Sequence, residues 1–437
     1  MNAEREGFIS REPLLGRDQR IVAYEFSHAL QSRIAEKRLL VRQFYDDVLL
    51  RHLAALDLDG FLEGRLAFLE LSPASLSHPA FVQLPRHNIF LSLALTVTDA
   101  PLADMALVRA LPSLKALRAN GTRVGMKWQY AWKMEASGWD ALLAEIDFIR
   151  ISWREFQDDS DDALERLVSL LRPVTRTLTA GTSPLRLVAS ELRTPEDFRR
   201  AYRLGFDLFR GDFINHREPG KISRSSTNRL RILQLLRHLR HDAETSRLTQ
   251  EIRQDPVLSY RLLRYVNSAA LGLNRQIGSL DQALTILGRD TLYRWLSTLL
   301  FHVVDPGYYE WALTEQALAR AALMERLGKY AGHAGLTRDD LFLAGLFSLL
   351  DKLLGEPLEK LATDIQVSDE LRAALVHRRG PLAQYLAFAE ACETTNTENI
   401  AARAQALGLS AQMVNLAIVE ALAWAQEMTR FSETAGN

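Results

Sequence analysis

Three features are scarce in this sequence of 437 residues. Cysteine occurs once, as Cys392, which excludes an internal disulfide framework and fits a reducing cytoplasm. Uninterrupted apolar runs of about 18 residues are missing, and the first ten residues, MNAEREGFIS, carry no apolar signal segment. Net charge is small, because 53 basic side chains oppose 54 acidic ones, for a formal charge of -1. We therefore expect a cytoplasmic protein without membrane association, and no overall field indicates a nucleic-acid partner.

Short apolar runs alternate with helical stretches in the first half of the chain. This pattern predicts a parallel sheet covered by helices, for example Leu39–Leu56 and Asp162–Leu171. Repeated strand–helix units favour an α/β TIM-like barrel with the strand ends at its mouth, and an open doubly wound sheet is the alternative. The predicted strands are Ile21–Phe26, Leu66–Leu71, Ile89–Leu95, Arg123–Met126, Phe148–Ile151 and Leu185–Ala189.

The strand signals stop near a segment rich in Pro, Gly, Ser and Thr, INHREPGKISRSSTN, which is the best linker in the chain. Apolar residues then recur at helical spacing to about Met428, and Asp255-Pro256 predicts one of the helix starts. With a chain too long for one core of usual size, we expect two domains. The predicted boundaries are a barrel at 1–216, a linker at 217–228 and an all-α domain at 229–437.

Two stretches of the second half resemble the HDOD domain, a helical relative of the HD phosphohydrolases that has lost its metal site. They are DPVLSYRLLRYVNSAALGLNRQIGSLDQALTILG, starting at Asp255, and AGLFSLLDKLLGEPLEKL, starting at Ala344. The resemblance implies that Ser348 and Leu349 stand where an active HD enzyme carries its His-Asp pair. A hydroxyl and an isobutyl group cannot replace those metal ligands. We interpret the scattered histidines as ordinary surface or helix-end residues, namely His302, His333 and His377.

The first half resembles an EAL domain, the barrel that hydrolyses cyclic di-GMP. The opening stretch REPLLGRDQRIVAYEFSHAL, the strand FLELSPASL and the later LVASELRTPEDFRRAYRLGFDLFRGDFI carry the resemblance. An EAL domain followed by an HDOD domain is similar to a known class of bacterial signalling protein. The resemblance implies a hydrolase that holds two divalent cations between several oxygen ligands.

Most positions of that metal site differ in this sequence. The signature glutamate is kept as Glu25, although its Ala-Leu neighbours are Phe26 and Ser27. The stretch RVGMKWQYAWK places Lys127 and Trp128 at the family's paired aspartates, so an ammonium replaces a metal ligand. We therefore predict no catalytic residues, no metal ligands and no cofactor. The remaining ligand positions correspond to Glu70, Ala94, Ser190 and, for the lysine that assists water, Arg150.

The same resemblance defines a vestigial ligand pocket at the barrel mouth, formed by Glu25, Glu70, Lys127 and Arg150. An alternative is that Glu25 only pairs with Lys127 or Arg150 in an ion-pair network. The family's other nucleotide contacts are altered as well. They correspond to Glu12, Ala29 and Arg210.

These losses in both domains predict a protein that is not an enzyme. The expected function is a non-catalytic bacterial signalling adaptor that acts through contacts with unidentified signalling proteins. The alternatives are a metal-independent cyclic di-GMP receptor and a weak cyclic di-GMP phosphodiesterase that uses Glu25 and Glu70. The sequence does not indicate the partner, the pathway or the oligomeric state.

Overall fold

The chain forms two compact units in the computed structural model. Unit 1 contains Met1–Lys221, Gly307–Ala312 and Ala391–Glu420, and unit 2 contains Ile222–Pro306, Leu313–Glu390 and Ala421–Asn437. The linear division at 216 and 229 stays a prediction, and residues 218–225 of its linker lie outside the described residues. The described residues are 8–28, 39–54, 58, 65–84, 88–93, 111–128, 145–156, 163–169, 171, 185–217, 226–241, 243–267, 276–301, 307–331, 336–394 and 397–433.

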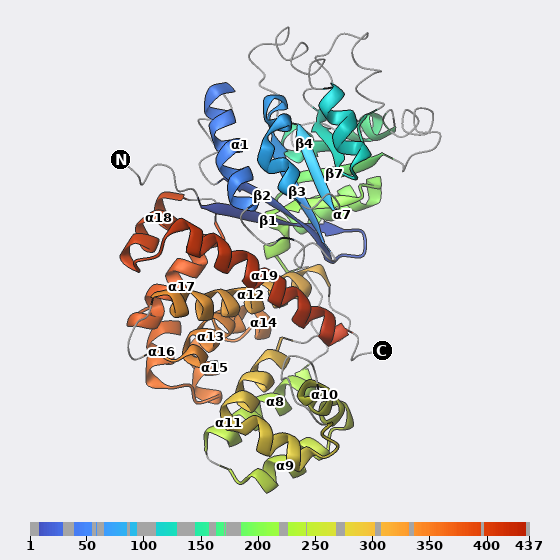
Figure 1. Cartoon of the computed structure of the whole chain (residues 1–437). Coiled ribbons are helices and arrows are strands. Elements are labelled where there is room, and N and C mark those ends of the chain that lie inside the picture. The colour runs from blue at the N-terminus through green and yellow to red at the C-terminus, as the bar shows by residue number, and fades with distance from the viewer. Residues whose placement is uncertain are drawn as a thin grey trace. The chain divides into compact units, whose positions relative to one another are not determined.

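Eight strands of unit 1 close into a barrel in sequence order (Figure 1). The first strand runs antiparallel to both of its neighbours, and the other neighbouring pairs are parallel. This closure confirms the predicted α/β TIM-like barrel and excludes the open sheet. The strands are β1 (Ile9–Gly16), β2 (Ile21–His28), β3 (Leu66–Leu71), β4 (Ile89–Leu93), β5 (Arg123–Lys127), β6 (Phe148–Ser152), β7 (Arg186–Leu192) and β8 (Leu208–Gly211).

The strands predicted from hydrophobic runs correspond to β2 through β7. Strand β1 is additional, and it contains Pro13, which lacks the N–H group that a sheet needs and so argues against a strand. Strand β8 is additional as well, because its four residues, LFRG, are too short for an alternating pattern. Helix α1 (Leu39–Ala54) begins at the predicted residue, and residues 163–169 are helical as expected.

A ring of apolar side chains fills the inside of the barrel. Phe68, Phe90 and Phe148 meet there, with ring centroids 4.8–5.4 Å apart. Strand β5 contributes Gly125, and a Cβ at this position would lie 2.4 Å from the Phe148 ring, so the glycine makes room for the phenylalanine. This core layer consists of Leu14, Ala23, Phe68, Phe90, Phe148, Val188 and Leu208.

Unit 1 also includes short segments from later in the chain. Tyr308, at the start of α12 (Tyr308–Ala331), is fully buried with its ring centroid 4.9 Å from that of Phe198 on α7 (Pro195–Leu204). The amide N–H of Ile9 donates a buried hydrogen bond of 3.0 Å to the side-chain oxygen of Asn415, which lies on α19 (Ala411–Glu433). The barrel therefore packs with residues far beyond its own strands.

Unit 2 is helical, as predicted for the second half. The Asp255 side chain caps the helix that begins at Pro256, accepting hydrogen bonds of 3.0 Å from the amides of Val257 and Leu258. Helices that lie wholly or mainly in unit 2 are α8 (Ser226–Arg240), α9 (Thr245–Arg253), α10 (Pro256–Val266), α11 (Leu280–Leu299), α12, α13 (Arg338–Phe347), α14 (Leu350–Leu354), α15 (Leu358–Asp364), α16 (Asp369–Leu375), α17 (Pro381–Cys392) and the last part of α19. Helix α18 (Thr397–Ala406) belongs to unit 1.

Within the described ranges, no single helix is long and apolar enough to cross a membrane. One pair, Asn399–Ala406 with Ala411–Thr429, reaches the required length and composition only together, and it is bent by 103°.

Candidate functional site

A ring of polar side chains lies directly above the apolar core of the barrel, at the carboxyl ends of the parallel strands. Side chains alternate between the two faces of a strand, so the residue two positions from each core residue also points inward. On β3, for example, Phe68 belongs to the core and Glu70 to the ring above it. We call this ring the mouth layer, and its members, one per strand, are Glu12, Glu25, Glu70, Ser92, Lys127, Arg150, Ser190 and Arg210.

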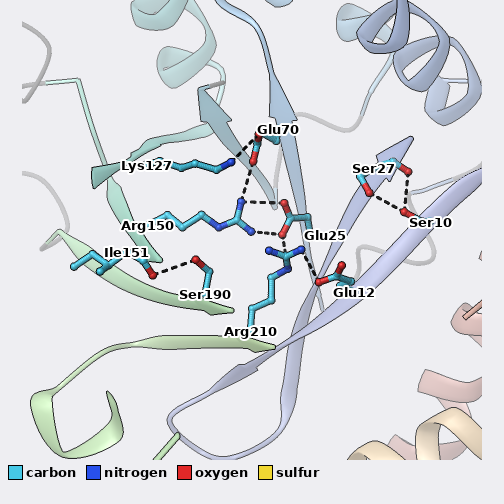
Figure 2. A network of polar contacts seen from close by, with 10 residues as sticks. All are labelled: Ser10, Glu12, Glu25, Ser27, Glu70, Lys127, Arg150, Ile151, Ser190 and Arg210. Carbon is cyan, nitrogen blue, oxygen red and sulfur yellow. Dashed lines mark hydrogen bonds and ion pairs between the residues drawn. The ribbon is translucent and has the colours of Figure 1, made fainter. Parts of the chain in front are cut away.

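Arg150 is the centre of the mouth layer (Figure 2). Its Nη1 donates to Glu25 Oε1 at 3.0 Å and to Glu70 Oε2 at 3.1 Å, and its Nη2 donates to Glu25 Oε2. The Arg150 side chain is only 3% exposed and that of Glu25 only 6%. Arg150 therefore joins the carboxylates of β2 and β3 through a buried, bidentate ion pair, the strongest geometry for such a contact.

Two further cations complete the network from more exposed positions. Arg210 Nε lies 2.9 Å from Glu25 Oε2, and Arg210 also pairs with Glu12 at 2.5 Å. Lys127 Nζ donates to Glu70 Oε1 at 3.1 Å. The side chains of Arg210 and Lys127 are 20% and 29% exposed, so solvent reaches both, in contrast to Arg150.

Charge is segregated around the mouth layer. The carboxylates Glu12, Glu25 and Glu70 stand on the adjacent strands β1, β2 and β3. Two cations stand across the barrel, on β5 and β6, and the third stands on β8, which pairs with β1. Figure 2 shows the side chains reaching across the barrel to one another. Three negative and three positive groups therefore compensate each other inside a largely buried ring.

The ion pairs fix the protonation states at the centre. Burial alone raises the pKa of Glu25, but Arg150 and Arg210 outweigh burial and hold this pKa below its usual value. Burial alone lowers the pKa of Arg150, but Glu25 and Glu70 outweigh it and hold this pKa above its usual range. Both groups are charged at neutral pH.

The two serines of the mouth layer differ in their contacts. The Ser190 hydroxyl donates to the Ile151 carbonyl at 3.1 Å and is thereby engaged in the sheet. The Ser92 side chain is buried, and its hydroxyl finds no hydrogen-bond partner among the residues that the structure describes. A buried hydroxyl without a partner is unfavourable, so this position suits a polar ligand atom or a water molecule.

A second acidic pair lies at the rim, beyond β6 and within β7. Glu191 has a left-handed backbone with φ of 62°, which is uncommon for a residue other than glycine, and it coincides with an irregular register between β7 and β8. The Ser152 hydroxyl donates to its carboxylate. Burial raises the pKa of Glu155, Glu191 raises it further and Lys127 opposes both. No sequence motif marks this pair, and its members come together only in the folded barrel.

The structure brings together all four residues predicted for the vestigial pocket. The alternative pairing of Glu25 is resolved as well, because its partner is Arg150 whereas Lys127 pairs with Glu70. Whether the four bind a ligand stays a prediction. Ala29 and Ala94 lie outside the described residues. The resemblance had already placed Glu12 and Arg210 at this mouth, and the structure adds that Arg210 pairs with Glu12 and with Glu25.

The resemblance to an EAL domain implies two divalent cations at the mouth layer, which would need several oxygen ligands free to bind them. Three carboxylates converge, but each is bound to a cation of the protein itself, and Lys127 contributes an ammonium group in place of a ligand. Over the described ranges, no group of three or more His, Cys, Asp or Glu side chains is arranged to hold a metal. The residues present do not fit a two-metal site.

In unit 2, a buried arginine lies beside Ser348, one of the two positions that the resemblance assigns to the lost His-Asp pair. Arg320 Nη1 donates to the Ser348 hydroxyl at 2.7 Å, and its guanidinium lies 3.6 Å from Glu390. Ser348 in turn donates to the Gly345 carbonyl at 2.6 Å, and Leu349 is buried. Of the three histidines noted in the sequence, His377 is exposed and the other two lie outside the described residues.

Comparison with known proteins finds one family and two relatives. A family model for the HDOD domain matches residues 225–356. The chain is 26% identical over 429 residues to "Cyclic di-GMP phosphodiesterase CdgJ" of Vibrio cholerae serotype O1, which covers 97% of this chain and 93% of that protein. It is 25% identical over 396 residues to the uncharacterized protein YuxH of Bacillus subtilis, covering 89% of this chain and 91% of that protein.

Among solved structures, the chain is similar to the EAL domain of FimX from Pseudomonas aeruginosa bound to c-di-GMP. The two share 15% identity over 49% of this chain and 91% of that chain, with a TM-score of 0.37. The PaMucR phosphodiesterase in its c-di-GMP complex shares 18% identity over 50% of this chain and 94% of that chain, with a TM-score of 0.35.

These findings confirm one prediction and overturn another. The closed barrel and the HDOD match agree with the predicted order of a TIM-like barrel followed by a helical HDOD domain. The prediction that the chain is not an enzyme is wrong by the same comparison, because a relative that matches 97% of the chain is named a phosphodiesterase. The prediction came from counting lost metal ligands, and that count alone does not establish a loss of activity.

Proposed function

We propose that this chain, an EAL-type barrel followed by an HDOD domain, works in cyclic di-GMP signalling by binding the dinucleotide at the mouth layer. The observation that carries the proposal is the partial exposure of two cations of that layer, Lys127 and Arg210, to solvent. A phosphodiester is an anion, and Arg and Lys are the side chains that bind phosphate oxygens best. The single cysteine supports a cytoplasmic location for this activity.

Each residue of the mouth has a distinct part in this proposal. Lys127 uses one of its three N–H donors for Glu70, and the others face the approaching phosphate. Arg210 is paired with Glu25 and Glu12, so it can contact a phosphate only if the partly exposed Glu12 side chain moves away from it. Arg150 is too deeply buried to touch the ligand, and it holds the two central carboxylates away from it. The Ser92 hydroxyl is available to a polar ligand atom.

The relative named a phosphodiesterase makes hydrolysis of cyclic di-GMP the reaction to measure together with binding. The donor set does not fit two divalent cations, so we derive no metal-assisted step. The described residues supply electrostatic attraction and orientation of the phosphates.

The test is isothermal titration of the full chain with cyclic di-GMP, combined with chromatography of the nucleotide after incubation. We expect saturable binding, and we expect Lys127→Gln to weaken it about ten- to a hundredfold, since a charge-assisted contact to phosphate contributes roughly 1.5–3 kcal/mol. The matched control is Lys115→Gln, an equal loss of charge at an exposed position outside the barrel. No binding by the wild type, or equal affinity in the Lys127 variant, would contradict the proposal.

A further inference from the structure

We infer that the mouth layer excludes divalent cations, because the guanidinium of Arg150 is the built-in counter-ion of the carboxylates that would otherwise hold a metal. This inference does not depend on the identity of the ligand bound at the mouth. The side-chain cations of the protein and a divalent cation from the solvent compete for the same carboxylate oxygens.

The carboxylates carry the kind of oxygen atom that a hard cation prefers, but three such side chains are not arranged around one metal position in the described part of the chain. Glu12, Glu25 and Glu70 supply up to six oxygen atoms from neighbouring strands, and Mg²⁺, Mn²⁺ and Ca²⁺ prefer such oxygens. In the structure, however, both oxygens of Glu25 and both of Glu70 already accept contacts from Arg150, Arg210 or Lys127. Glu12 is paired with Arg210.

Charge balance favours the protein's own cations. Glu12, Glu25 and Glu70 contribute three negative charges, and Lys127, Arg150 and Arg210 contribute three positive charges, so the layer is neutral. A dication added to this ring would leave an excess of two positive charges in a poorly solvated space. Repulsion between like charges at such short range is strong when water does not screen it.

Displacing Arg150 is the second obstacle for a metal ion. An arginine cannot lose its proton in a protein, so it cannot become neutral to make way for the metal. With only 3% of its side chain exposed, it also has no route to solvent without a rearrangement of β6. A metal that took Glu25 and Glu70 would leave this guanidinium buried without a counter-charge, which is strongly unfavourable.

Any action on a phosphodiester at this mouth is therefore expected to be the same with Mg²⁺ as with a chelator. The pairing also explains why Glu25 and Glu70 are both present without the rest of a metal site. Both carboxylates neutralise the charge of the buried Arg150 and accept its hydrogen bonds, which is a structural reason for an acidic residue on β2 and on β3.

The test uses Mn²⁺ itself as the probe. Electron paramagnetic resonance of free Mn²⁺ is recorded while the full wild-type chain is titrated, and the thermal midpoint is measured in Mn²⁺ and in EDTA. We expect no saturable binding and no shift of the midpoint. The variant Arg150→Gln removes the guanidinium shared by Glu25 and Glu70, leaves each carboxylate with one cation, and is expected to gain one Mn²⁺ site. The control Arg199→Gln, which removes a half-exposed arginine of α7, should gain none.

Saturable binding of Mn²⁺ to the wild type that is lost in Glu25→Gln, and kept in the exposed-site control Glu196→Gln, would overturn the inference. The wild-type titration decides the question even if the Arg150 variant fails to fold. Because the readout is the metal alone, a failure of cyclic di-GMP binding leaves this result unaffected.

Discussion

The variant Arg150→Met is expected to lower the free energy of unfolding of unit 1 by about 3–5 kcal/mol, the usual cost of removing one partner from a buried ion pair. Methionine keeps much of the side-chain volume and removes the charge. Glu25 would then stay 6% exposed with Arg210 as its remaining partner, and Glu70 would keep only Lys127 from the pairs described here. Urea unfolding followed by tryptophan fluorescence and circular dichroism measures the change.

Two further variants identify the cause of that loss. Arg199→Met removes an arginine of a half-exposed ion pair on α7 and is expected to change the free energy by at most about 0.5 kcal/mol. The double variant Arg150→Met/Glu25→Gln should recover part of the lost stability, because it also removes the charge left without its main partner. Equal losses for Arg150→Met and Arg199→Met would show that the buried network does not stabilise the barrel.

Acid is expected to destabilise unit 1 through Glu25. Its folded-state pKa is lowered from 4.5: burial opposes the shift, but Arg150 and Arg210 outweigh burial. A carboxylate with a lowered pKa contributes stability that is fully present above the unfolded-state value of about 4.3 and is lost as the pH falls through the folded-state value. The free energy of unfolding should therefore stay level from pH 7 to pH 5 and fall below pH 4.

The dependence on Glu25 can be measured directly. Urea unfolding at a series of pH values should show a shallower decline below pH 4 for Glu25→Gln than for the wild type, from a lower plateau at neutral pH. The variant Glu196→Gln, at an exposed position of α7, should keep the wild-type slope. A wild-type slope in Glu25→Gln would mean that other carboxylates cause the acid sensitivity.

The strands of the barrel were predictable where hydrophobic runs were long and uninterrupted. Strands β2 to β7 bury nearly continuous apolar segments, as the strands of a covered parallel sheet do. Strand β1 runs in the opposite direction and carries Arg11, Glu12 and Pro13 in sequence, which hides its strand character. Its recognition required the resemblance to a family, because local propensity argues against it.

The candidate site was predictable in its membership and less so in its pairing. The resemblance to a family grouped Glu25, Glu70, Lys127 and Arg150, and alternation along the strands is consistent with all four pointing inward. Which oxygen meets which nitrogen depends on the stagger of neighbouring strands. Lys127 is opposite Arg150 in the register of β5 and β6, yet the two reach different carboxylates.

The prediction of an inactive protein failed for a separate reason. The absence of family ligands was read as the absence of activity, whereas CdgJ bears the name of a phosphodiesterase and matches nearly the whole chain. The prediction considered only the positions of the family's metal ligands and no other ionisable groups near the mouth. Glu155 at the rim is such a group, and only its position in the fold brings it under the influence of Glu191 and Lys127.

The most direct test of the account is the affinity of the full chain for cyclic di-GMP, measured by isothermal titration once in EDTA and once in millimolar Mg²⁺. The account predicts saturable binding with the same affinity in both buffers, because Lys127 and Arg210 supply the positive charge and the ion pairs of Arg150 keep metal out. Binding that appears only in Mg²⁺, or no binding in either buffer, would contradict it.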